Sequence, residues 1–69
     1  MINNDRELEV TQARIQRLEQ QVAQIRRTAT DGENYRLSTA GFLAEIDRMN
    51  LDVRDYLWSL PVEHSGSAI

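Results

Sequence analysis

Apolar residues recur along the first part of the chain at alternating spacings of three and four. The run extends from Leu8 to Ala29, and glutamine, arginine and glutamate fill most positions between its members. An α-helix brings residues at this spacing onto one face, so the pattern predicts an amphipathic helix over about residues 5–29. Its apolar face consists of Leu8, Thr11, Ile15, Leu18, Val22, Ile25 and Ala29.

The sequence offers two starting points for this helix. Asn4 followed three residues later by Glu7 resembles a capping box, in which side chains satisfy the free backbone amides of the first turn. Thr11 is an alternative N-cap, preceded by a short extended segment over residues 8–10. We expect the helix to start near Asn4.

The end of this helix is expected between Thr28 and Asp31. No glycine or proline occurs before Gly32, so nothing interrupts the helix earlier. Thr30, Asp31 and Gly32 are turn-forming residues, and Gly32 can adopt the left-handed conformation that often follows a helix.

A second run of alternating spacings predicts a helix over about residues 39–60. Ser38 or Thr39 is expected to cap its start, because either hydroxyl can accept from a free backbone amide. Leu43 and Leu57 broaden the apolar face on one flank. The face itself consists of Phe42, Ile46, Met49, Val53, Tyr56 and Leu60.

Pro61 is expected to end the second helix, because proline lacks an amide donor and biases the preceding residue away from helical geometry. Residues 62–69 are small and polar for the most part, and we expect them to form a mobile C-terminal tail. His64 lies in this tail, where an ordinary solvated histidine is expected.

Two helices of similar length joined by a loop over about residues 30–38 predict an antiparallel hairpin. The fold class is therefore all-α. The pattern leaves the register open: Val22 faces either Met49 or, one heptad away, Phe42. Both registers keep every apolar residue between the helices.

The short length of the chain indicates that an isolated hairpin would be only marginally stable. It has 69 residues and a mass of 8.0 kDa, and it contains no cysteine. A single core of this size supplies only about 3–5 kcal/mol, and disulfides are excluded as a supplement. We therefore expect self-association or docking on another protein.

The second helix carries a further apolar stripe that a lone hairpin would leave in water. Its members recur every seven residues on the side roughly opposite the first face, and we call them the outer stripe: Leu37, Ala44, Leu51 and Trp58. Scattered surface apolar residues are common, which is the plainer interpretation. We favour an interface, with Trp58 as its anchor, because tryptophan is enriched among residues that dominate binding energy.

The favoured assembly is a homodimer of hairpins forming a four-helix bundle. The alternative is a coiled coil between the first helices of two chains, which β-branched residues at Ile15 and Val22 would suit. The oligomer interface is predicted to use Ile15, Leu18, Val22, Ile25, Phe42, Ile46, Met49, Val53, Tyr56 and Leu60, extended by Leu51 and Trp58.

Charge is divided along the chain. Residues 11–30 carry four arginines against Glu19 alone, whereas residues 31–69 carry three arginines against seven acids. Packing between helices of opposite charge explains this division. The alternative is a nucleic-acid surface on the first helix, because arginines that neutralise phosphates supply non-specific affinity. The possible contacts are Arg14, Arg17, Arg26 and Arg27.

Candidate catalytic groups are scarce. The chain has no lysine or cysteine nucleophile, and its single histidine is His64 in the predicted tail. Serine and threonine therefore lack a base partner. Carboxylates cluster on the second helix, but the Glu-x-x-His pairs of dinuclear metal bundles are missing. We expect no enzyme activity, no cofactor and no metal site.

Signals for membranes or secretion are not found either. The longest uninterrupted stretch of apolar and small residues spans residues 40–44, far below the ~20 needed to cross a bilayer. The first residues lack the apolar segment of a secretory signal. We expect a cytoplasmic protein of bacterial type.

The N-terminal segment resembles small bacterial antitoxin-like proteins. The similarity covers about residues 1–27 and consists of Met1-Ile2-Asn3-Asn4-Asp5-Arg6-Glu7, then Thr11-Gln12-Ala13 and a helix rich in glutamine, arginine and leucine. Members of that group continue into a helix-turn-helix domain, for which this chain has no counterpart. The resemblance therefore implies a protein-binding helical segment and gives no support for repressor activity.

Together these patterns predict a non-enzymatic, oligomeric protein–protein interaction module, accessory to a toxin–antitoxin or regulatory operon. The alternative is a nucleic-acid-associated regulator that uses the arginines of the first helix.

Overall fold

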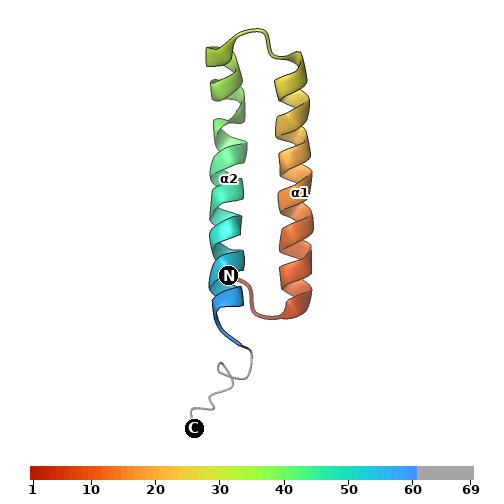
Figure 1. Cartoon of the computed structure of the whole chain (residues 1–69), viewed down its shortest axis with the longest axis vertical. Helices are drawn as coiled ribbons and strands as arrows, with labels where there is room; N and C mark the ends of the chain where they lie inside the picture. Colours follow the sequence, from red (N-terminus) through yellow and green to blue (C-terminus); the bar gives the residue numbers. More distant parts are fainter. Residues whose placement is uncertain (61–69) are drawn as a thin grey trace.

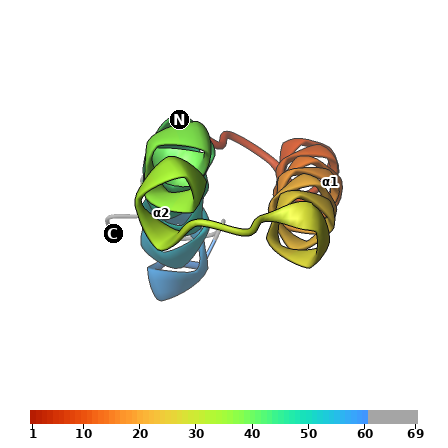
Figure 2. The same ribbon diagram turned by 90° about the horizontal axis from the view of Figure 1, so that it is seen from above.

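The chain folds into two long helices that run antiparallel (Figure 1). This computed structural model describes residues 1–60. Helix α1 spans Asp5–Thr28 and helix α2 spans Gly32–Trp58. The all-α hairpin predicted from the sequence is confirmed. Viewed from above, the helices lie side by side and the N-terminal segment crosses from α1 to α2 (Figure 2).

Helix α1 begins where the capping residues predict. The Asn4 side chain accepts from the backbone amide of Glu7 at 2.8 Å, and the Glu7 carboxylate accepts from the amide of Asn3 at 2.8 Å. These two bonds form a modified capping box. In the regular motif the Glu7 side chain would accept from the amide of Asn4, the N-cap residue, whereas here it accepts from the amide of Asn3. Thr11 lies inside the helix, so the alternative start was wrong.

Helix α2 begins well before the predicted start. Asp31 is its N-cap, and the carboxylate accepts from the amides of Glu33 and Asn34, each at 3.4 Å. The predicted loop over residues 30–38 and the caps at Ser38 and Thr39 were therefore wrong. The reason is that Asp31 acts as a helix cap rather than as part of a longer turn.

Gly32 also has a different role from the predicted one. It is the first residue of α2, whereas the C-cap of α1 is Ala29 in an extended conformation, with φ −73° and ψ 135°. No left-handed glycine is needed, because an extended residue is enough to turn the chain before Asp31 caps the next helix. The Thr39 hydroxyl, inside α2, donates to the carbonyl of Tyr35 at 2.8 Å and is fully buried.

Helix α2 ends at Trp58, where the amide of Ser59 donates to the carbonyl of Tyr56 at 3.3 Å. Leu60 was predicted inside the helix and on its packed face, but it lies beyond the helix and is 60% exposed. The predictions for Pro61, His64 and the tail over 62–69 lie outside the described residues.

The core lies between the helices and is small. Ile15, Ile46 and Met49 are buried, with Leu18, Val22 and Val53 packed against them. Both ends of this arrangement fix the register: the short turn at one end and a hydrogen bond from the Tyr56 hydroxyl to Asp5 at the other. Counting along the helices from these ends places Val22 level with Ser38 and Thr39, about one turn from Phe42, so the register with Val22 opposite Met49 was wrong.

Candidate interaction surface

The outer stripe of α2 faces away from α1. Leu37 is 74% exposed, Leu51 52% and Trp58 82%, and Ala44 is also exposed. These residues are one heptad apart, whereas the buried residues Ile46 and Met49 occupy the other side of the same helix. The structure thus brings together the four residues that the sequence singled out.

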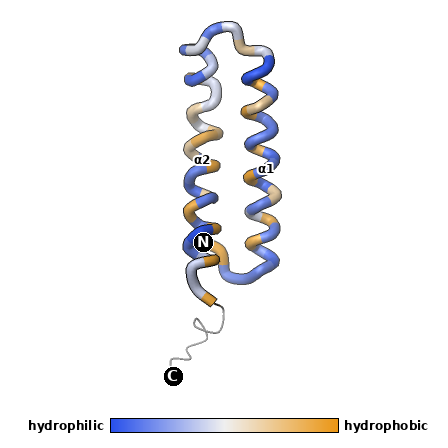
Figure 3. Tube along the Cα trace, in the orientation of Figure 1, coloured by the Kyte–Doolittle hydropathy of each residue, from blue (hydrophilic) through white to orange (hydrophobic). Residues whose placement is uncertain are grey.

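Exposed apolar residues are distributed unequally between the two helices. Among the described residues, α1 exposes one large hydrophobic side chain, Val10, whereas α2 exposes Leu37, Leu43, Leu51, Leu57 and Trp58. Figure 3, coloured by the hydropathy of each residue, shows α1 mostly blue with isolated orange bands and α2 with longer pale and orange stretches. Helix α1 therefore has one apolar face, and α2 has two.

The other predicted interface residues lie mostly inside the hairpin. Three are buried in the core described above, and six are half-buried between α1 and α2. Leu60 is the exception, because it lies beyond the end of α2. The six half-buried residues are Leu18, Val22, Ile25, Phe42, Val53 and Tyr56.

Four charged residues surround Leu51 on the outer face of α2. Asp47 and Arg54 lie on one side of the outer stripe, and Arg48 and Asp55 lie on the other, because each is three or four residues from Leu51. All four are exposed. The acidic and basic totals of the sequence do not indicate this order of charges around the outer stripe, which needs the continuous helix through Leu51.

Three of these four charges already have local partners. The Arg48 guanidinium contacts the Glu45 carboxylate at 2.6 Å, and Arg54 lies 3.6 Å from the carboxylate of Asp55. Both pairs are within the same helix and largely in solvent, so each contributes little to stability and can be exchanged for a new partner.

The arginines of α1 are spread around its surface. Arg14, Arg17, Arg26 and Arg27 are all exposed, and none forms an ion pair within residues 1–60. Arg26 and Arg27 lie in the last turn of α1, where positive charge favours the helix dipole. That position gives them a structural role that requires no ligand.

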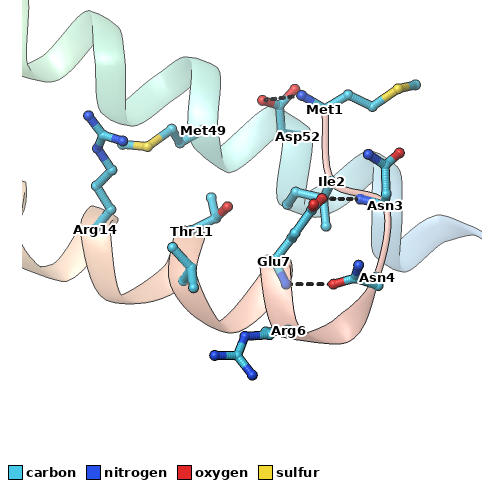
Figure 4. Close-up of a pocket in the computed structure, with 11 residues that line it drawn as sticks. Met1, Ile2, Asn3, Asn4, Arg6, Glu7, Thr11, Arg14, Met49 and Asp52 are labelled. Atoms are coloured by element: carbon cyan, nitrogen blue, oxygen red, sulfur yellow. Dashed lines mark hydrogen bonds and ion pairs between the residues drawn. The ribbon is translucent and has the colours of Figure 1, made fainter.

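A depression near the N-terminus is occupied by contacts within the chain (Figure 4). The Met1 amino group lies 3.9 Å from the Asp52 carboxylate, and Glu7 accepts from the amide of Asn3. Figure 4 shows Met1, Ile2 and Asn3 lying across this end of the hairpin, next to Glu7 and Asp52. The polar groups here hold the N-terminal segment against both helices.

The hydrogen bond between Tyr56 and Asp5 perturbs the tyrosine. Its donor and acceptor oxygens are 2.6 Å apart. The bond to Asp5 raises the pKa of Tyr56 above its ordinary value, with smaller contributions from burial and from the negative charges of Asp5 and Glu7. The protonated hydroxyl is the donor, so the neutral form is favoured.

No candidate metal-binding cluster is found in the described part of the chain. Within residues 1–60, no three histidine, cysteine or acidic side chains gather closely enough to hold a metal ion. Neither described helix is long and apolar enough to cross a membrane. The chain matches no protein-family model, no curated protein and no solved structure.

Proposed function

We propose that this chain is a non-enzymatic protein–protein interaction module that self-associates through the outer face of α2. The observation that carries the proposal is the exposed outer stripe, whose large apolar residues are Leu37, Leu51 and Trp58. A row of exposed apolar residues along one face of a helix, as found here, is typical of an interaction surface. Self-association would also stabilise the fold, because the core between the helices is small and an interface would bury additional apolar surface.

The setting of this module follows from the resemblance of its first 27 residues to antitoxin-like proteins. On that basis we place it in the bacterial cytoplasm, as an accessory component of a toxin–antitoxin or regulatory operon. Its role there is to hold proteins together, since the described residues offer an exposed apolar surface.

The proposal is tested by molar mass from light scattering over a dilution series. We expect a mass above that of the monomer at high concentration. Trp58→Ala should raise the dissociation constant at least about tenfold, because truncation of a tryptophan buried in an interface commonly costs more than ~1.4 kcal/mol of binding. Arg17→Ala is the control, since Arg17 lies on α1 and is exposed; it should change the constant less than about twofold.

Two results would contradict the proposal. One is a monomer at every concentration that nonetheless melts cooperatively at micromolar dilution. The other is equal, negligible effects of the Trp58 and Arg17 substitutions on the dissociation constant, which would remove Trp58 from the interface.

A second candidate function is association with nucleic acid through α1. The supporting observation is that the four arginines of residues 11–30 are exposed and form no ion pairs among the described residues. Binding to random duplex DNA should then weaken steeply with added salt, because phosphate contacts release counterions. No binding at low salt removes this candidate.

A further inference from the structure

We infer that the outer face of α2 is self-complementary and pairs antiparallel with α2 of a second copy, about a twofold axis at Leu51. This inference rests on the proposed self-association and specifies its geometry. The axis places Leu51 against the same residue of the second copy. The two α2 helices lie in the centre of the dimer, and the two α1 helices lie outside.

The order of charges around Leu51 supports this pairing. In an antiparallel pair related by a twofold axis, residues on one side of the stripe meet residues on the same side of the second helix. Asp47 therefore meets Arg54 of the second copy, and Arg48 meets its Asp55. The symmetry repeats each contact, so four pairs of opposite charge surround the apolar centre.

The sizes of the apolar residues support the same arrangement. Trp58 and Ala44 are each seven residues from Leu51, on opposite sides, so the indole of one copy lies over Ala44 of the other. The helix around Ala44 is also narrow, because Ala40 and Gly41 lie next to it. A Cβ added at Gly41 would have no side chain within 4 Å, so the flank of α2 beside Ala44 is uncrowded.

A parallel pairing fits the same face less well. It would place Trp58 against Trp58 and Ala44 against Ala44, so that the helices are forced apart at one end and leave a gap at the other. Charges alone do not exclude it, because Asp47 would then meet Arg48 and Arg54 would meet Asp55. The two pairings therefore differ in which charges are partners, and charge exchange separates them.

The test measures the dimer dissociation constant of the full chain by sedimentation equilibrium. Asp47→Arg and Arg54→Asp should each weaken the dimer about tenfold or more, because each replaces two attractive contacts with two repulsive ones. The double variant Asp47→Arg with Arg54→Asp should return to within about threefold of the unchanged chain, because both antiparallel contacts are restored with reversed sign.

A second double variant distinguishes the orientations. Asp47→Arg with Arg48→Asp should weaken an antiparallel dimer, because it places like charges at all four contacts. In a parallel dimer residue 47 of one copy meets residue 48 of the other, so the same double variant keeps that contact attractive with the signs exchanged. The controls are Glu9→Arg and Arg17→Asp, which make the same charge changes on the exposed surface of α1. They should leave the dissociation constant nearly unchanged. Helical circular dichroism confirms that each variant is folded.

The outcomes separate this inference from the proposed function. If the chain dimerises and Trp58→Ala weakens it, but the Asp47 and Arg54 exchange shows no rescue, the antiparallel geometry is overturned and self-association stands. Rescue by the Asp47 and Arg48 exchange instead would establish the parallel pairing. A chain that stays monomeric overturns both.

Discussion

At the scale of single residues, Tyr56 and Asp5 join the two helices at the end opposite the turn. Their side chains are 51 positions apart in the chain and meet at 2.6 Å. The bond closes the part of the hairpin that the turn cannot constrain. Neither residue was expected in this role: Tyr56 was predicted as part of the apolar face, where its ring does lie half-buried. The sequence pattern locates a ring well, but it does not identify the acceptor of its hydroxyl, which depends on the register.

Tyr56→Phe tests this bond. We expect it to lower the melting temperature by a few degrees at neutral pH, because it removes the bond and little else. The pKa of Tyr56 is higher in the folded chain than in the unfolded one, so the stabilisation is fully present below pH about 10 and is lost as pH rises through the folded pKa. Thermal melts between about pH 8 and 11 should show a smaller alkaline decline for the variant than for the unchanged chain.

Tyr35→Phe is the matched control for that measurement. It removes a tyrosine hydroxyl near the turn, for which no hydrogen bond is found within residues 1–60. If the melting temperature falls by the same amount between about pH 8 and 11 in Tyr56→Phe and in the unchanged chain, the Tyr56 hydroxyl does not stabilise the fold.

At the scale of elements, the two helices differ in how well their sequences define them. The start of α1 and its apolar face from Leu8 to Ile25 were predicted correctly, because spacing and capping residues agree there. Ala29 was wrongly included in that face, since it is the exposed, extended C-cap of α1. The start of α2 was placed about two turns too late. Thr30, Asp31 and Gly32 are typical of a turn, and a turn does not reveal whether a helix follows at once. Asp31 both belongs to the turn and caps α2. Whether it caps a helix depends on its backbone conformation, which the residue types do not determine.

Substitutions at the two competing caps distinguish these starts of α2. Asp31→Ala should cost about 1 kcal/mol of unfolding free energy, because it leaves the first amides of α2 without an acceptor. Ser38→Ala should be neutral or slightly stabilising, since alanine is the better helix former in a helix interior. Urea unfolding followed by circular dichroism measures both. The reverse order of effects would place the start of α2 near Ser38.

At the scale of the whole molecule, the outer stripe was predicted from the sequence and the hairpin leaves it exposed. The charges around Leu51 were not predicted, since their significance appears only once α2 is known to be a continuous helix through them. The residues that pack between the two helices of one chain were predicted to belong to the oligomer interface. Spacing alone cannot separate contacts within a chain from contacts between chains, because both require the same apolar face.

The small core makes the whole fold sensitive to a single buried residue. Ile46→Ala should cost about 2–4 kcal/mol, which is most of the ~3–5 kcal/mol that a core of this size supplies. Leu57→Ala removes an exposed side chain and should stay within about 0.5 kcal/mol. Chemical unfolding at a fixed protein concentration compares them. Similar stability of the two variants would show that the helices are not held together by this core.

The polar exterior of α1 bears on how large the proposed assembly can become. Helix α1 exposes one large hydrophobic side chain, Val10, and its other exposed positions are mostly glutamine, glutamate and arginine. If two copies pair through α2 as proposed, the α1 helices on the outside offer a third copy little apolar surface. The proposed pairing is therefore expected to close at two subunits rather than to extend into fibres.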